Sequence, residues 1–136
     1  MRVIVVAVGR LRDPFADDVA HYARLLGRYT KLELVEVRDD AGVSARIPER
    51  AFISQLEVGG DALDSLAFSD FLRRHRESAR DLCFVIGGPY GGLKLERADH
   101  QLSLGPITLP HQLARVVLLE QIYRAHKILA GEPYHH

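Results

Sequence analysis

Two loops carry residues whose types and spacing suggest chemistry. The first, residues 87–92, reads Gly-Gly-Pro-Tyr-Gly-Gly and follows the apolar run 84–86. Glycine adopts positive φ angles and lets a ligand or another backbone approach closely, so this run predicts a loop shaped around something. It is not a P-loop, because no Gly-Lys-Ser/Thr follows, and its glycine spacing differs from that of dinucleotide-binding folds. A glycine-rich surface turn is the alternative interpretation.

The second loop, residues 104–110, is unusually apolar for a segment that normally faces water. It contains Leu104, Gly105, Pro106, Ile107, Thr108, Leu109 and Pro110. Such a loop can hold a flat heterocycle between its side chains while its backbone N–H and C=O groups read the edge of the ring. A loop buried under its neighbours explains the composition equally well.

Charged candidates lie on the helix expected over residues 111–130. Arg115 falls on the apolar stripe of this helix, where a charge is costly unless it is paired or used. Glu120 and Arg124 have i,i+4 spacing, which predicts an ordinary surface ion pair. The remainder of the helix is apolar around more than half of its circumference, which predicts burial against the sheet and against a partner subunit.

The histidines and the single cysteine do not indicate a metal site or a nucleophile. Four of the seven histidines fall in the last quarter of the chain, without the spacing of zinc ligands. Cys83 lies in an apolar run, where a lone cysteine is usually a small core residue. No Ser/His/Asp or Cys/His arrangement stands out.

The elements that must position these residues alternate between strands and helices. Strands are expected at 2–8, 31–37, 51–58, 81–86 and 101–104. Helices are expected after a cap at Asp13 with Pro14 in the first turn, after Asp64 or Ser65, over 93–100 and over 111–130. Gly59 and Gly60 should end the third strand, and Leu66, Phe68, Phe71 and Leu72 should face inward. This pattern predicts one α/β domain, residues 1–136, with a mostly parallel sheet. Both loops then follow strand carboxyl ends, where such sheets bind ligands.

Composition limits the class of protein. The formal net charge is zero, which counts mildly against a bulk nucleic-acid binder. The apolar start of the chain is too short for a signal sequence, and no run approaches the roughly 20 residues that cross a membrane. We therefore expect a soluble, cytoplasmic protein.

The motifs of the second half resemble those of one family. "IGGPYG", followed by "LSLGPITLPHQLARVVLLEQIYRAHKILAGEPYHH", is similar to the small SPOUT methyltransferases called ribosomal RNA large-subunit methyltransferase H. The opening "VAVGRLRD" and "YARLLGRY" fit less specifically, and the resemblance covers essentially the whole chain.

The resemblance implies an α/β fold with a C-terminal trefoil knot that works as a homodimer. It implies methyl transfer from S-adenosylmethionine to N3 of a pseudouridine in large-subunit (23S) rRNA on the assembled ribosome, without a metal. The implied cofactor contacts are Leu56, Gly87, Leu104, Gly105, Pro106, Ile107, Thr108 and Leu109. The polar candidates for catalysis are Arg115, Arg124, Tyr134 and His135, and the residues do not show which one is the base.

The chain also departs from the family's pattern. It is about 20 residues shorter than typical members, around 38–50, where the family usually has a longer helix. The usual Leu-Asp motif reads Leu56-Glu57, and Tyr90 replaces an acidic residue. The alternatives are a SPOUT enzyme acting on another RNA and a non-catalytic ribosome- or nucleotide-binding module. Cofactor binding separates the module from both kinds of enzyme.

Overall fold

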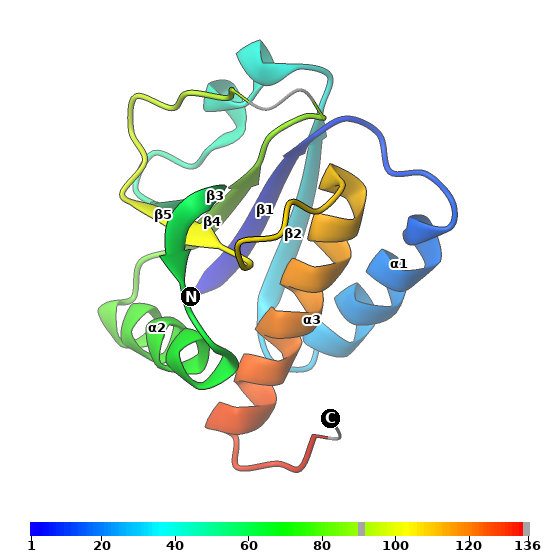
Figure 1. Ribbon diagram of the computed structural model, residues 1–136. Coiled ribbons are helices and arrows are strands. Elements are labelled where there is room, and N and C mark those ends of the chain that lie inside the picture. Colours follow the sequence, from blue (N-terminus) through cyan, green and yellow to red (C-terminus); the bar gives the residue numbers. More distant parts are fainter. Residues whose placement is uncertain (90–91, 135–136) are drawn as a thin grey trace.

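The computed structural model describes residues 1–89 and 92–134 (Figure 1). Within these residues, five strands form one sheet in the order β2-β1-β4-β3-β5, and all neighbouring pairs are parallel. The strands are β1 (Arg2–Val8), β2 (Lys31–Val37), β3 (Phe52–Ala62), β4 (Leu82–Ile86) and β5 (His100–Ser103). The helices are α1 (Phe15–Leu26), α2 (Ser65–Ser78) and α3 (His111–Leu129), with short 3₁₀ turns η1 (Asp40–Gly42) and η2 (Ser44–Arg46). The predicted parallel α/β sheet flanked by helices is confirmed.

The three α-helices cover one face of the sheet, with α3 packed between α1 and α2 (Figure 1). Alternate residues of β1 and β4, among them Val5 and Phe84, point into this layer because side chains of a strand alternate between faces. They meet Leu118, Leu119 and Ile122 of α3, which are almost completely buried. This apolar layer fixes α3 against the middle of the sheet.

The opposite face of the sheet is covered by segments without α-helix. Ile4, Val6 and Val85 point to this side and pack with Val43, from the connection after β2, and Leu93, from the connection after β4. Cys83 lies in the same layer, and burial raises the pKa of its thiol to about 12. It is the core residue that its sequence position predicted.

The third strand is longer than predicted, because Gly59 and Gly60 lie inside β3 and do not end it. The pairing of β3 with β5 shifts register between Leu56 and Asp61, so residues 57–60 bulge out of the ladder. A Cβ on Gly60 would lie 2.7 Å from the backbone of Gln101, so only glycine fits this approach of β3 to β5.

One of the two helix starts expected from the sequence differs from the structure. Asp13 does not cap α1, whose cap position is Pro14 and lacks a side-chain hydrogen bond. The carbonyl of Arg12 instead accepts the N–H groups of Phe15 and Ala16. In contrast, the Asp64 carboxylate accepts the Ala67 N–H at 2.8 Å and caps α2 as predicted.

Leu66 does not face inward with the other apolar residues of α2. It is 69% exposed, whereas Phe68, Phe71 and Leu72 are buried as expected. Residues two positions apart in an α-helix lie about 200° apart around its axis, so Leu66 and Phe68 fall on opposite faces.

The helix predicted over residues 93–100 is wrong, because that segment is irregular before β5 begins at His100. Leu93 is buried in the second core layer, and the Asp99 carboxylate and N–H both bond the backbone of Ile53. These contacts hold the segment against β3 and the second core layer. The predicted long helix is confirmed as α3, and Gly131, with φ +68°, follows it.

Candidate functional site

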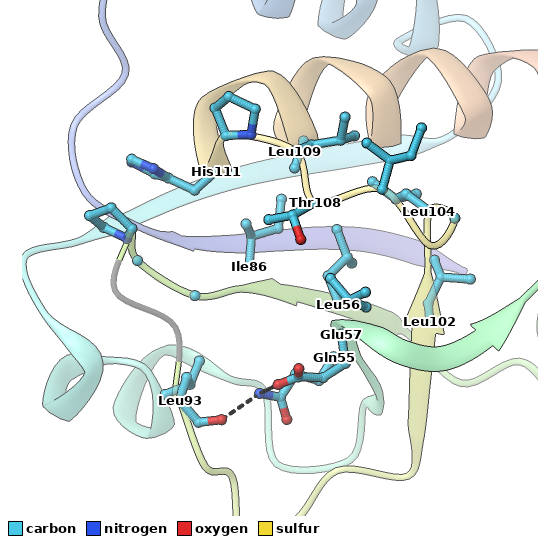
Figure 2. Close-up of a pocket in the computed structure, with 18 of the residues that line it drawn as sticks. Gln55, Leu56, Glu57, Ile86, Leu93, Leu102, Leu104, Thr108, Leu109 and His111 are labelled. Carbon is cyan, nitrogen blue, oxygen red and sulfur yellow. Dashed lines mark hydrogen bonds between the residues drawn. The ribbon is translucent and has the colours of Figure 1, made fainter.

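A pocket of about 560 Å³ opens at the carboxyl ends of β4 and β5, beside the bulge of β3 and the start of α3 (Figure 2). Its walls come from three stretches that are far apart in the sequence, namely 55–58, the loop after Ile86, and the loop after Ser103 together with the first turn of α3. A volume of this size suits a ligand of the drug or cofactor class. The two loops singled out in the sequence therefore meet at one cavity.

Seven of the eight predicted cofactor contacts line this pocket. They are Leu56, Gly87, Leu104, Gly105, Ile107, Thr108 and Leu109. The eighth, Pro106, lies in the same loop but is not part of the lining. Leu102 and Ile86 add apolar surface to the walls, so a flat apolar ring would find side chains on both sides (Figure 2).

Gly87 and Gly88 leave room at the floor of the pocket. A Cβ on Gly87 would lie 3.3 Å from the Leu93 Cβ, and one on Gly88 would lie 3.1 Å from Cγ1 of Val8. Both distances are tighter than ordinary van der Waals contact. Side chains at these positions would have to displace a buried neighbour, Leu93 or Val8. The glycine run therefore keeps space where the strand ends.

A buried amide joins two of the walls. The Gln55 side chain, 3% exposed, donates through Nε2 to the Leu93 carbonyl at 2.8 Å. The same nitrogen lies 3.3 Å from Oε1 of Glu57, which places that carboxylate at the same end of the pocket (Figure 2). Sequence patterns gave no indication of Gln55, since glutamine in a strand carries no distinctive signal.

His111, the first residue of α3, brings an imidazole to the pocket lining. Burial, with contributions from the nearby charges of Arg115 and Arg12, lowers the pKa of His111. The ring is therefore neutral in neutral solution. The sequence did not single out His111 as a site residue, although it follows directly on the apolar loop in "TLPH".

Arg115 is buried next to the pocket but does not line it. Its guanidinium donates to Oε2 of Glu36 at 2.6 Å and to the carbonyls of Val8 and Gly9 at 3.2 and 2.6 Å. Gln112 bonds the backbone of Arg10 and Arg12 in the same connection. The expectation that Arg115 must be paired is confirmed, and the start of α3 thereby fastens the connection between β1 and α1.

Arg124 and Tyr134 lie together near the end of α3. The Arg124 guanidinium lies 4.3 Å from the centre of the Tyr134 ring, and both side chains bond Oε2 of Glu120 at 3.1 Å. The Glu120–Arg124 pair is confirmed, but it is largely buried and not an exposed surface bridge. Burial first, and then the Glu120 charge, raise the pKa of Tyr134, so its phenol stays protonated and acts as a hydrogen-bond donor.

The structure does not bring this pair to the pocket of its own chain. Along α3, Arg124 lies roughly 20 Å from His111 at 1.5 Å per residue. His135, the fourth catalytic candidate, and Tyr90 lie outside the described residues.

Within residues 1–89 and 92–134, no cluster of His, Cys, Asp or Glu is placed to hold a metal ion, and no helix is long and apolar enough to cross a membrane.

Comparison with known proteins connects this architecture to one group. A family model described as "Predicted SPOUT methyltransferase" matches residues 1–135. Curated relatives called "Ribosomal RNA large subunit methyltransferase H" are similar over nearly all of the chain. The relative from Gluconacetobacter diazotrophicus is 44% identical, with 96% of this chain and 95% of the relative covered. That from Acidiphilium cryptum is 45% identical, with 98% and 93% covered.

A third relative shows that this chain is short for its group. The protein of the same name from Gemmatimonas aurantiaca is 39% identical over 153 aligned positions, with 99% of each chain covered. Because that alignment is longer than the 136 residues of this chain, the relative has residues that are missing here. Shortening was expected around 38–50, and in this chain η1 and η2 are the helical turns of that segment.

Proposed function

The chain belongs to the SPOUT methyltransferase family, and on that premise we propose that it methylates ribosomal RNA with S-adenosylmethionine as the donor. The proposed acceptor is N3 of a pseudouridine in large-subunit (23S) rRNA, presented by the assembled ribosome in the cytoplasm. The single observation that carries the proposal is the pocket to which both the glycine-rich loop after β4 and the apolar loop after β5 contribute. It gathers seven of the eight residues that the resemblance assigned to the cofactor.

The pocket suits S-adenosylmethionine in size and chemistry. Apolar side chains on facing walls, among them Leu56 and Leu109, match the flat surface of an adenine ring. Backbone N–H and C=O groups of the loop 104–109 match its polar edge, apart from those of Gly105, which bond Oγ of Ser103. The space that Gly87 leaves beside Leu93 is the part of the cavity that a side chain would fill. These residues would hold the adenosyl group.

The donor supplies a methyl group on a positively charged sulfur. The main task of the protein in such a displacement is to hold donor and acceptor in line. The N3–H of the acceptor must also lose its proton, which requires a base or a group that stabilises the anion. Arg115, Arg124, Tyr134 and His135 remain the proposed candidates. The protonated phenol of Tyr134 favours a hydrogen-bonding role for that residue.

We propose further that the protein forms a homodimer and that its C-terminal half forms a trefoil knot. The roughly 20 Å between His111 and Arg124 along α3 supports the first part, because one chain does not bring its tail to its own pocket. Partly exposed apolar residues on α3, including Val117 and Ile128, supply surface for a second copy.

The test is transfer of an isotopically labelled methyl group from S-adenosylmethionine by the purified protein. Assembled ribosomes, naked 23S rRNA and a short stem-loop are offered in parallel, and the labelled nucleotide is mapped by mass spectrometry. The proposal predicts one N3-methylated pseudouridine on ribosomes and little product on the stem-loop. Equal rates on the stem-loop, or product in another RNA, would contradict the ribosomal substrate. No binding of S-adenosylmethionine and no transfer to any RNA would indicate the non-catalytic module.

A further inference from the structure

Glu57 is the one side chain with a full charge among the described residues that line the pocket. The remaining lining consists of apolar side chains, glycines and prolines, together with the neutral groups of Gln55, Thr108 and His111. The pocket wall therefore carries a net charge of minus one, located where β3 bulges.

The Glu57 carboxylate has no cationic partner within the described part of the chain. Its hydrogen bond comes from the neutral amide of Gln55, at 3.3 Å. Gln55 is itself held by the Leu93 carbonyl at 2.8 Å, so the donor that orients the carboxylate is fixed in the core. The first turn of α3, with its partial positive charge, lies on another wall of the pocket and is not paired with Glu57 (Figure 2).

A half-buried, unpaired carboxylate in an apolar pocket favours a cationic ligand over a neutral one. The attraction between charges is stronger here than in water, because the apolar walls lower the local dielectric constant. The two forms of the proposed cofactor differ in this respect. S-adenosylmethionine carries a sulfonium charge, and S-adenosylhomocysteine, which remains after transfer, does not.

We propose that Glu57 is a specificity-determining residue that makes the pocket bind the charged methyl donor more tightly than the neutral product. In the transfer, the C–S bond breaks and its electron pair stays on sulfur, while the methyl carbon bonds to N3 and the N3 proton leaves to a base. The sulfur thus loses its charge, and with it the attraction to Glu57. This inference rests on the proposed function.

The charge acts on loading and release of the cofactor and not on the chemical step. A group that stabilises the charged donor in the ground state gives no help to a transition state in which that charge is disappearing. We therefore expect Glu57 to lower the Kd of the donor without raising the rate of transfer. The product dissociates more readily because it lacks the charge.

The experiment is calorimetric titration of the purified wild-type protein and of Glu57→Gln with each compound separately. Glutamine keeps the shape of the side chain and removes its charge. We expect the donor to bind about five- to tenfold more weakly to the variant, as one screened charge pair gives. The Kd of the product should stay within twofold of its wild-type value. The preference for the donor, measured as the Kd of the product divided by the Kd of the donor, should therefore fall about as much as donor binding weakens.

Glu77→Gln is the matched control, because it removes the same charge from the exposed surface of α2. Both of its Kd values should equal those of the wild type. Equal weakening of donor and product by Glu57→Gln would overturn the inference, since Glu57 would then act on a part that both molecules share. Unchanged binding of the donor to a folded Glu57→Gln protein would also overturn it.

These outcomes are separate from failure of the proposed function. If the wild-type protein binds both compounds and the Kd ratio is insensitive to Glu57, only the role of Glu57 is rejected. If the wild-type protein binds neither compound, the cofactor assignment itself fails, and the inference fails with it.

Discussion

The side-chain amide of Gln55 donates a 2.8 Å hydrogen bond to the backbone carbonyl of Leu93, a residue 38 positions later in the chain. Gln55 belongs to β3, whereas Leu93 follows the glycine loop after β4, and both line the same pocket. The bond therefore sets the separation of two walls that the backbone ladders do not connect directly at this point. It also orients the amide that contacts Glu57.

Replacing Gln55 by leucine should weaken both the fold and the pocket. The side chain keeps its approximate volume, but the Leu93 carbonyl loses its donor, at a cost of about 1–3 kcal/mol for a buried group. We expect that loss in denaturant unfolding, together with at least threefold weaker binding of S-adenosylmethionine by calorimetry. Gln101→Leu, at an exposed position of β5, is the control and should change neither. Wild-type stability of Gln55→Leu would show that the bond contributes nothing.

Replacing Gly87 by valine should block the cofactor while the protein stays folded. The new Cβ meets Leu93 at 3.3 Å, and the two added methyl groups add bulk between two residues that line the pocket. We expect at least a hundredfold weaker binding of S-adenosylmethionine in calorimetry. Gly59→Val is the control, since a Cβ there meets nothing within 4 Å. Unchanged affinity in a folded Gly87→Val protein would exclude this pocket as the cofactor site.

His126 should make stability depend on pH. It is 3% exposed and stacked on Tyr29, and burial, together with the Arg76 charge, lowers its pKa from 6.5 to about 4. The unfolded chain therefore takes up a proton at a higher pH than the folded chain. The contribution is complete above pH 6.5 and is lost as the pH falls toward about 4, with a slope of at most ~1.4 kcal/mol per pH unit.

The measurement is the free energy of unfolding of wild type and His126→Phe between pH 8 and pH 5. Phenylalanine keeps a stacked ring but cannot take up a proton. Below pH 6.5 the wild type should therefore lose stability relative to the variant. His21→Gln, at an exposed position, is the control and should leave the curve parallel to wild type. Parallel curves for His126→Phe would contradict the buried, neutral state of this imidazole.

Mixed dimers should test whether each site is built from two subunits. A Gly87→Val subunit has an intact tail but no cofactor, and a subunit truncated after Pro133 has the cofactor but no tail. Neither homodimer should methylate ribosomes. If the tail acts on the partner's cofactor, each mixed dimer contains one complete site, and activity returns after subunit exchange. Exchange that is demonstrated by mass spectrometry without any recovered activity would refute the shared site.

Local patterns predicted most of the fold because strand and helix periodicities depend on neighbours in the sequence. The predictions of strand ends and helices failed where contacts between residues distant in the sequence determine the local structure. Gly60 was expected to end a strand, but its backbone approaches Gln101, which local rules cannot anticipate. The segment 93–100 has helical composition, but Asp99 and Leu93 draw it against β3 and the second core layer.

The candidate site, like the fold, was predictable where local sequence patterns carry the signal. The two loops were visible as runs of glycine and of apolar residues, because they depart from ordinary loop composition. Gln55 and His111 were missed, since their roles arise only when β3 and α3 meet the loops in space. Arg115 was recognised as a buried charge, but its partners Glu36 and Gly9 lie at least 79 positions away and could not be named.

Mass mapping of 23S rRNA from a strain that lacks the gene tests whether the protein methylates large-subunit rRNA through this pocket. One N3-methylated pseudouridine should disappear in that strain. It should return when the wild-type protein is expressed, and not when Gly87→Val is expressed at the same level. An unchanged set of methylated nucleotides in the deletion strain, or full restoration by Gly87→Val, would contradict methylation through this pocket.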